Sequence, residues 1–274
     1  MNMELRCSSR RAASSSDMAE HMGSKRTGDQ TGAPGTGVKR LPLRALGHMQ
    51  LTDRDVEILS WVARHGIVTV DQIAIKFFPT PQGKSACFQR VRKLCDASPP
   101  LLQRDRTHYQ EPSVLRVTTY GARIADVGLS PARIVHAEIH HALSLVDLTE
   151  AILALHPDAT LITERERRAE RYRDKRKGLR KTTGRIPDAV FMLPAKGSRK
   201  EQTIAVELDR TARSKMDAEA VIRAYLSERY DHVWWYVRPS RVASLTEIVK
   251  RGRVADLFEV GVTSGNGSQS TLRK

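Results

Sequence analysis

Acidic residues interrupt two apolar segments that have the composition of β-strands. Residues 185–191 (RIPDAVF) carry Asp188, and residues 204–210 (IAVELDR) carry Glu207 and Asp209. Because side chains alternate between the two faces of a strand, we expect Glu207 and Asp209 on one face and the segment's Ile, Val and Leu residues on the other. If the two strands pair, Asp188 joins them and three carboxylates come together.

Three neighbouring carboxylates repel one another unless protons or a cation neutralise them. Oxygen ligands are the ones that Mg2+ and Mn2+ prefer. The pattern therefore predicts that Asp188, Glu207 and Asp209 bind Mg2+ or Mn2+. The alternative is that the strands end in solvent, where these acids are hydrated like other surface carboxylates.

The composition favours a polyanionic partner. Lys and Arg outnumber Asp and Glu by 46 to 31, a formal net charge of +15 in 274 residues. Contacts between such residues and phosphates release counterions, so we expect DNA as the partner. No apolar run reaches the roughly 20 residues of a membrane-spanning helix and no signal-peptide pattern is present, so we expect no membrane partner. Three cysteines without metal-ligand spacing predict reduced thiols and a cytoplasmic protein.

Changes in composition divide the chain into four parts. Residues 1–47 have few large apolar side chains and cannot offset the entropy lost on ordering, so they are predicted to be a disordered basic tail. Within it, residues 21–24 (HMGS) resemble a cloning junction, which makes part of the tail a tag. Residues 48–129 and 130–262 have the apolar periodicity of folded domains, and residues 263–274 are predicted to be a second disordered tail.

The first domain has the pattern of a winged helix. Capping boxes at Thr52 with Asp55 and at Thr69 with Gln72 begin two helices, and Gly66 ends the first. The elements that follow are a third helix from about residue 84 and two extended stretches, 101–104 and 114–118. In the winged-helix plan the third helix enters the major groove of DNA and the wing contacts the backbone or the minor groove.

The cations of this domain fall where a winged helix contacts DNA. The third helix turns a polar, mostly basic face outward, and the wing adds two arginines. A basic face that is merely solvated is the alternative. The predicted DNA-binding residues are Lys84, Gln89, Arg90, Arg92, Lys93, Arg104 and Arg106.

The second domain is predicted to be a three-layer α/β fold, which makes the whole chain α+β. Ser130 and Pro131 favour a helix start, because serine caps N-termini and proline fits the first turn. From there the order is α-β-β-β-α-β. The expected elements are a helix from Ser130 to about Leu155, strands at 160–163, 185–191 and 204–210, a helix at 214–230, a strand at 233–237 and a last helix at 242–251. In the fourth strand, Trp234 and Trp235 are expected to pack on opposite faces.

A very basic stretch separates the first two strands of this domain. Residues 165–185 contain eleven Lys or Arg and three acids. The pattern predicts a mobile segment that clamps phosphates and stacks on bases, and a solvated loop is the alternative. The residues predicted to bind DNA here are Arg171, Arg173, Lys175, Arg176, Lys177, Arg180 and Lys181.

The order of these motifs resembles a known family. Pro187-Asp188 and Glu207-Leu208-Asp209 on an α-β-β-β-α-β order are similar to the PD-(D/E)-x-K nuclease superfamily. With a winged helix in front, residues 48–260 resemble replication-relaxation proteins of plasmids and integrative elements. The motifs that carry this resemblance are Leu51-Thr52-x-Arg54-Asp55, His141-x-Leu143 with Asp147, Ile186-Pro187-Asp188, and Glu207-x-Asp209-Arg210-Thr211 with Tyr225.

The resemblance implies a function in replication or in conjugative mobilisation, where a nuclease-like site nicks a transfer origin. It implies that Asp188 and Glu207 hold Mg2+ or Mn2+ with the assistance of Asp209. The first helix of a nuclease-like core often lends one acid, so Asp147 is a further candidate metal ligand, with Glu150 of the same helix as the alternative.

One position departs from the pattern of the family. Asp209 stands where the nuclease motif has the lysine that orients the attacking water and supports charge on the phosphate. Arg210 is expected on the opposite face of the strand, so Lys215 of the next helix is the remaining candidate for that catalytic role. The departure favours a second hypothesis, a non-catalytic replication initiator or relaxosome accessory protein. A third is a transcriptional regulator whose second domain forms a homodimer. The expected partners are DNA, a second copy of the chain and other relaxosome proteins.

Overall fold

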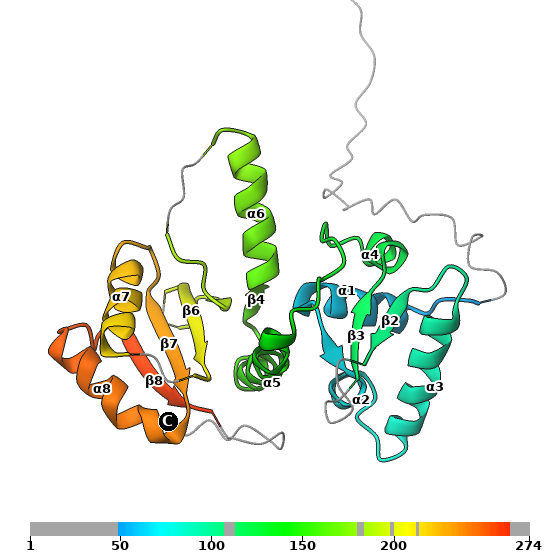
Figure 1. Cartoon of the computed structure of the whole chain (residues 1–274), viewed down its shortest axis with the longest axis horizontal. Coiled ribbons are helices and arrows are strands. Elements are labelled where there is room, and N and C mark those ends of the chain that lie inside the picture. The colour runs from blue at the N-terminus through cyan, green and yellow to red at the C-terminus, as the bar shows by residue number, and fades with distance from the viewer. Residues whose placement is uncertain (1–48, 107–112, 180–183, 198–199, 212–213, 264–274) are drawn as a thin grey trace, which may run out of the picture. The chain divides into compact units, whose positions relative to one another are not determined.

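The computed structural model describes residues 49–106, 113–179, 184–197, 200–211 and 214–263. These residues form eight α-helices and two β-sheets, a mixed α+β structure, and both sheets belong to one compact unit (Figure 1). Apart from Thr263, the tails predicted to be disordered lie outside the described residues, as do Arg180 and Lys181. Within the described ranges, no helix combines the length and the apolar character that crossing a bilayer requires.

The first helices begin and end as their sequences predict. Thr52 and Thr69 each accept a hydrogen bond from the backbone N–H three residues on, and the side chains of Asp55 and Gln72 accept from the N–H of those threonines. Gly66 ends the first helix with a φ of 90°, a region that other residues rarely adopt. The three helices are α1 (Asp53–His65), α2 (Val70–Phe77) and α3 (Gly83–Asp96).

A three-stranded antiparallel sheet accompanies these helices. Its members, in spatial order, are β1 (Val68–Thr69), β3 (Val114–Val117) and β2 (Leu102–Asp105). The two extended stretches predicted from the sequence therefore pair directly, as β2 with β3. An apolar cluster that includes Ile58, Ile73 and Leu94 packs α1, α2 and α3 together. β1 and the helix α4 (Thr119–Ala125) are additions to the predicted elements.

A five-stranded sheet follows with its own helices. Its elements are α5 (Ile139–Leu155), β4 (Thr160–Thr163), α6 (Glu164–Arg176), β5 (Ala189–Leu193), β6 (Gln202–Asp209), α7 (Lys215–Leu226), β7 (His232–Val237), α8 (Val242–Arg251) and β8 (Phe258–Val262). The strand order is β4-β5-β6-β7-β8, antiparallel from β4 to β6 and parallel from β6 to β8. The predicted order is present as α5, β4, β5, β6, α7 and β7, and α8 has its predicted bounds, whereas α6 and β8 are additional.

Each face of this sheet packs against different helices. Trp235 of β7 is fully buried in the cluster formed with α7 and α8, which lie beside β7 and β8 in Figure 1. Trp234 packs with the cluster on the opposite face, where Leu148 and Ile152 of α5 cover the sheet. The prediction that the two tryptophans occupy opposite faces is confirmed.

The side chains of β6 alternate as predicted. Ile204, Val206 and Leu208 pack on the face that α5 covers. Glu207 points to the other face, where its carboxylate meets a side chain of α7. The same period of two residues places Asp209 with Glu207.

The prediction for the start of the long helix is wrong. A helix was expected from Ser130, but α5 begins at Ile139. The preceding residues are instead tied to the first sheet, because Ile134 packs in a cluster with β3 and the carbonyl of Ala132 accepts a hydrogen bond from Arg116 at 3.2 Å. These contacts outweigh the helix start that serine and proline favour locally.

The prediction of a mobile basic stretch at residues 165–185 is wrong for its first part, because residues 164–176 form α6. Thr163 and Glu166 form a capping box at its start, and Arg168 donates to Glu164 one turn away at 2.9 Å. These local bonds offset the repulsion between the cations. No residue of α6 is buried, so packing contributes little to this helix.

Candidate functional site

Glu207 is the most enclosed acid of the predicted site. Its side chain is 1% exposed. Arg185 donates to both of its carboxylate oxygens, from Nε to Oε1 at 2.8 Å and from Nη2 to Oε2 at 2.7 Å, and the hydroxyl of Tyr225 on α7 donates to Oε1. Burial raises the pKa of Glu207 above its usual value, the bonds from Arg185 oppose this rise, and the charge of Asp188 adds to it. The bonds to Glu207 raise the pKa of Arg185, so the guanidinium keeps its charge.

Asp188 lies across the β5–β6 ladder from Glu207, so these strands bring the two acids together as the sequence predicts. Oδ2 of Asp188 accepts a hydrogen bond from the backbone N–H of Leu208 at 2.8 Å. Its Oδ1 is 3.5 Å from Nε2 of His141 on α5. The hydrogen bond to Asp188 raises the pKa of His141, although burial acts in the opposite direction. His141, when it is protonated, therefore adds a positive charge beside Asp188.

A cavity of about 280 Å³ lies at the end of β6. Asp209, which is 6% exposed, lines it together with His140, His141 and Arg210. Arg210 takes the opposite face of the strand from Glu207, as predicted, and donates to the hydroxyl of Ser144 on α5 at 2.7 Å. The cavity is thus polar and carries charges of both signs.

Lys215 and Asp147 have partners of their own. Lys215 is 59% exposed, with Nζ 3.8 Å from a carboxylate oxygen of Glu219. Asp147 accepts a hydrogen bond from Gln72 of α2 at 2.8 Å. On α5, Asp147 follows His141 by six residues, which is about 9 Å along the axis and roughly 120° around it. The helix therefore presents His141, and not Asp147, to the acids of the sheet.

As arranged, these residues do not fit a divalent metal ion. Among the residues that the structure describes, no group of three or more His, Cys, Asp or Glu side chains is placed to hold one. Both oxygens of Glu207 accept bonds from Arg185, and each oxygen of Asp188 faces a donor of the chain. Charge-assisted bonds of this kind are among the strong ones, so a metal must compete with them.

Three partners of the acids, namely Arg185, His141 and Tyr225, are not among the predicted site residues. Arg185 did carry a signal, because it stands three residues before Asp188 at the start of a strand-like segment. A cation beside a buried acid is a natural ion-pair partner. His141 and Tyr225 had no signal apart from the family resemblance.

The predicted DNA-binding face of the first domain is exposed at most positions. An ion pair between exposed side chains contributes little to stability. Arg92 and Asp96 form such a pair: their side chains are 83% and 67% exposed, and Nε and Oδ2 are 3.4 Å apart. The predicted DNA-binding residues that are exposed are Lys84, Gln89, Arg92 and Lys93 on α3, and Arg104 and Arg106 on or next to β2.

Arg90 differs from its neighbours on α3 because it is bound inward. Its Nε donates to Oδ1 of Asp55 on α1 at 2.6 Å, and its Nη2 donates to Oδ2 of the same carboxylate. Asp55 is 1% exposed. Burial raises the pKa of Asp55, but the bonds from Arg90 and Thr52 outweigh it and hold the pKa below its usual value. Arg90 therefore joins α3 to α1 and is not part of the exposed basic face.

α6 presents the cations of the basic stretch along a helix. Arg171 is half-buried and donates from Nη2 to the carbonyl of Gly184 at 2.6 Å. Tyr172 is 64% exposed among the cations. The exposed cations at the end of the helix are Arg173, Lys175, Arg176 and Lys177.

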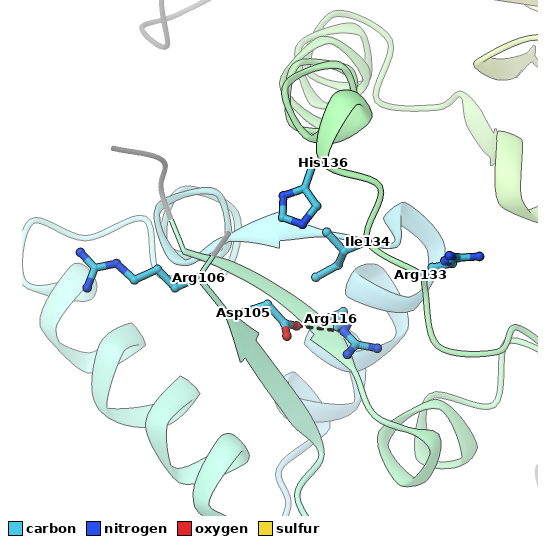
Figure 2. A pocket seen from close by; sticks show the side chains of 6 residues that line it. All are labelled: Asp105, Arg106, Arg116, Arg133, Ile134 and His136. Atoms are coloured by element: carbon cyan, nitrogen blue, oxygen red, sulfur yellow. Dashed lines mark hydrogen bonds and ion pairs between the residues drawn. The ribbon is translucent and has the colours of Figure 1, made fainter. Parts of the chain in front are cut away.

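A hollow of about 360 Å³ lies next to β2 and β3 (Figure 2). Asp105 and Arg116 form an ion pair in it, with Oδ2 and Nε 2.9 Å apart. Figure 2 shows that Arg106 and Arg133 point to opposite sides, so the arginines do not converge on one ligand. The lining residues are Asp105, Arg106, Arg116, Arg133, Ile134 and His136. Three arginines and one aspartate line the hollow, so its lining carries net positive charge.

Known proteins give no direct evidence for a function. No protein-family model, no curated protein and no solved structure matches the chain. The function is therefore inferred from the fold and from the placement of the charged residues.

Proposed function

We propose that the chain is a DNA-binding protein of a plasmid or integrative element, with a function in replication or conjugative mobilisation. Residues 49–129 form a winged helix that selects the DNA site, and α3 enters the major groove. The observation that carries the proposal is that α3 and the strand β2 with the residue after it, which lead to the proposed wing, carry the exposed cations Lys84, Arg92, Lys93, Arg104 and Arg106. The net charge of +15 favours a polyanion as the partner.

The order of elements supports this assignment. Three helices precede an antiparallel pair of strands, β2 and β3, whose connection is the wing of the plan. The tip of that wing, residues 107–112, lies outside the described residues. Arg104 and Arg106 lie at its base and extend the basic face of α3 toward it.

α6 is the second DNA contact in the proposal. The C-terminal end of α6 is exposed, so its cations can reach a ligand. Lys175, Arg176 and Lys177 contact phosphates, and Tyr172 supplies an aromatic face on which an unpaired base stacks. Duplex recognition by α3 and strand contact by α6 suit a protein that acts where DNA is opened.

The second domain, as a nuclease-like α/β fold, is the scaffold of this contact. The partners of Glu207 favour a replication initiator or relaxosome accessory protein over a nickase, because Arg185 and Tyr225 already bind the carboxylate that a nuclease needs open. A second copy of the chain and other relaxosome proteins are the protein partners in this proposal.

The test is the affinity of the full chain for a labelled mixed-sequence duplex, measured by fluorescence anisotropy as salt is varied. The variant changes Arg92, Lys93 and Arg104 to Gln. Each lost phosphate contact reduces the salt slope by about 0.9, so the slope should fall by about 2.7. Extrapolated from ~1 M salt, this amounts to about 100-fold weaker binding at ~0.15 M.

The matched control changes Lys250, Arg251 and Arg253 to Gln, which removes the same charge from the exposed end of α8. This control should keep a slope close to that of the parent protein. If the two variants lose affinity equally, binding is a property of net charge alone and the winged-helix proposal fails.

Metal-dependent nicking is the second candidate function. It is favoured by the placement of Asp188 opposite Glu207, beside a cavity that Asp209 lines. Supercoiled DNA carrying the origin of the element, incubated with the protein and Mn2+, tests it. Nicked product that disappears with Asp188→Ala, while DNA binding persists, would make this candidate the better one.

A further inference from the structure

The geometry points to Arg185 as a built-in cation that takes the place of a divalent metal beside Glu207. The inference concerns the acids of the second sheet and does not rest on the proposal of DNA binding. It accounts for two observations together: the buried Glu207 lies beside the partly exposed Asp188, and the residues around them do not fit a metal ion.

The carboxylate of Glu207 already has donors for both of its oxygens. Arg185 uses two parallel N–H groups at 2.8 and 2.7 Å, the fork geometry in which guanidinium binds carboxylate most strongly. Tyr225 adds a third donor. With the side chain 1% exposed, Glu207 has a partner for each oxygen and almost no contact with water.

The negative charges of the two acids are balanced by positive groups of the chain. Two carboxylates, Glu207 and Asp188, meet two cationic groups, Arg185 and His141 when it is protonated. Burying acids without such compensation is costly, so the cations are required for the fold as it stands. A divalent ion added to this set has to displace Arg185, because that side chain covers both oxygens of Glu207.

The backbone on each side of Arg185 is held by the rest of the chain. The carbonyl of the preceding residue, Gly184, accepts a hydrogen bond from Arg171 of α6 at 2.6 Å. A Cβ at Gly184 would lie 1.3 Å from Oε1 of Glu228, so a larger residue here would require the Glu228 side chain to move. Pro187 is buried on the other side. Arg185 therefore extends from a fixed segment and is 30% exposed, unlike a loose surface arginine.

The experiment is a set of thermal melts of the full chain without DNA, with MnCl2 or MgCl2 added stepwise. The wild-type melting temperature should not change, because Arg185 holds the site. Arg185→Ala should melt at a lower temperature, and that temperature should rise as Mn2+ is added, because the metal can now reach Glu207. Arg185→Ala combined with Glu207→Gln should regain part of the lost melting temperature and should no longer respond to Mn2+.

Arg168→Ala is the matched control, because Arg168 bonds an exposed partner on the same helix and does not contact Glu207. It should show neither the loss nor the response to metal. A wild-type melting temperature that rises with Mn2+, and does not rise in Glu207→Ala, would overturn the inference. So would an Arg185→Ala protein as stable as wild type and indifferent to metal. If Arg185→Ala does not fold, recovery of folding in the double variant supports the inference and a failure to recover contradicts it.

Discussion

Replacing Asp55 with Asn tests how the first domain holds α3 against α1. Asp55 of α1 is 1% exposed and accepts the guanidinium of Arg90 on α3 through both oxygens. It also accepts from the N–H of Thr52, which completes the capping box of α1. Asn keeps the size of the side chain and removes its charge and one of its acceptor oxygens, so the change acts on both interactions.

The size of the effect follows from the burial of the two partners. Removing one member of a buried ion pair costs roughly 3–5 kcal/mol. Arg90 is 22% exposed and regains some hydration, so the loss should be at or below the lower limit of that range. Because the amide oxygen of Asn still accepts at the cap, we expect a loss of about 2–3 kcal/mol in the free energy of unfolding. For a protein of this size that amounts to roughly 5–10 °C in the melting temperature.

The assay is urea unfolding followed by circular dichroism at several pH values, with Asp53→Asn as the control. Asp53 lies in the same first turn, is exposed and carries the same charge, so its replacement should cost less than about 0.5 kcal/mol. The pKa of Asp55 is below its usual value in the folded protein. Its contribution is therefore complete above the unfolded pKa of about 4 and is lost as pH falls through the folded pKa. The gap between wild type and Asp55→Asn should close in that acidic range.

Two results would refute this reasoning. If Asp55→Asn costs no more than Asp53→Asn, the bonds to Arg90 contribute nothing net to stability. If the gap between wild type and variant stays constant as pH falls below about 4, the lost stability does not come from the charge of Asp55.

Further predictions concern a histidine and the two tryptophans. Burial lowers the pKa of His65 to about 3, and the charges of Arg64 and Lys76 act in the same direction. Folding therefore loses stability as pH falls from about 6.5 toward 3, and His65→Gln should flatten that loss in urea titrations. Trp235→Phe should cost about 1–3 kcal/mol, because the ring is fully buried, whereas Trp234→Phe should cost less than about 1 kcal/mol. Equal losses of stability in the two tryptophan variants would contradict the conclusion that Trp235 is the more deeply buried of the two.

The ends of α1 and α2 could be predicted because the atoms that fix them lie close together in the sequence. Thr52 with Asp55 and Thr69 with Gln72 form their bonds across three residues, whatever packs around them. Gly66 is similar, since its φ of 90° is a local requirement of the turn. Helix ends that are fixed by contacts within a few residues can be predicted from the sequence, together with their bounds.

The predictions for the starts of α5 and α6 were wrong for two different reasons. At Ser130 the local signal was a valid cap, but contacts of the following residues with the first sheet prevailed, and these lie far away in the sequence. At Thr163 the local signal was present and pointed to a helix, because Thr163 and Glu166 match a capping box. The capping box and the ion pairs of Arg167 and Arg168 with acids one turn away favour a helix over a mobile stretch.

The approach of Asp188 to Glu207 could be predicted, but the cation that binds Glu207 could not. Alternation along a strand has a period of two residues, so it determines which acids share a face once the strands pair. Arg185 reaches Glu207 across the pair of strands through a long side chain with many rotamers. Its direction depends on the segment around Gly184, which contacts α6 and Glu228. The identity of the counter-ion is thus a tertiary property, while the placement of the acids is a local one.

The acids of α5 show why residue type alone does not assign a site. Asp147 accepts from Gln72 at 2.8 Å and Glu150 accepts from Lys76 at 2.6 Å, so both acids join α5 to α2. His141, earlier on the same helix, faces the acids of the sheet. The rotation of α5 about its axis decides which of these residues meets the sheet, and that rotation is set by the apolar residues that α5 packs against the strands. Asp147 and Glu150 therefore connect α5 to α2, and neither takes the place beside Asp188 that His141 occupies.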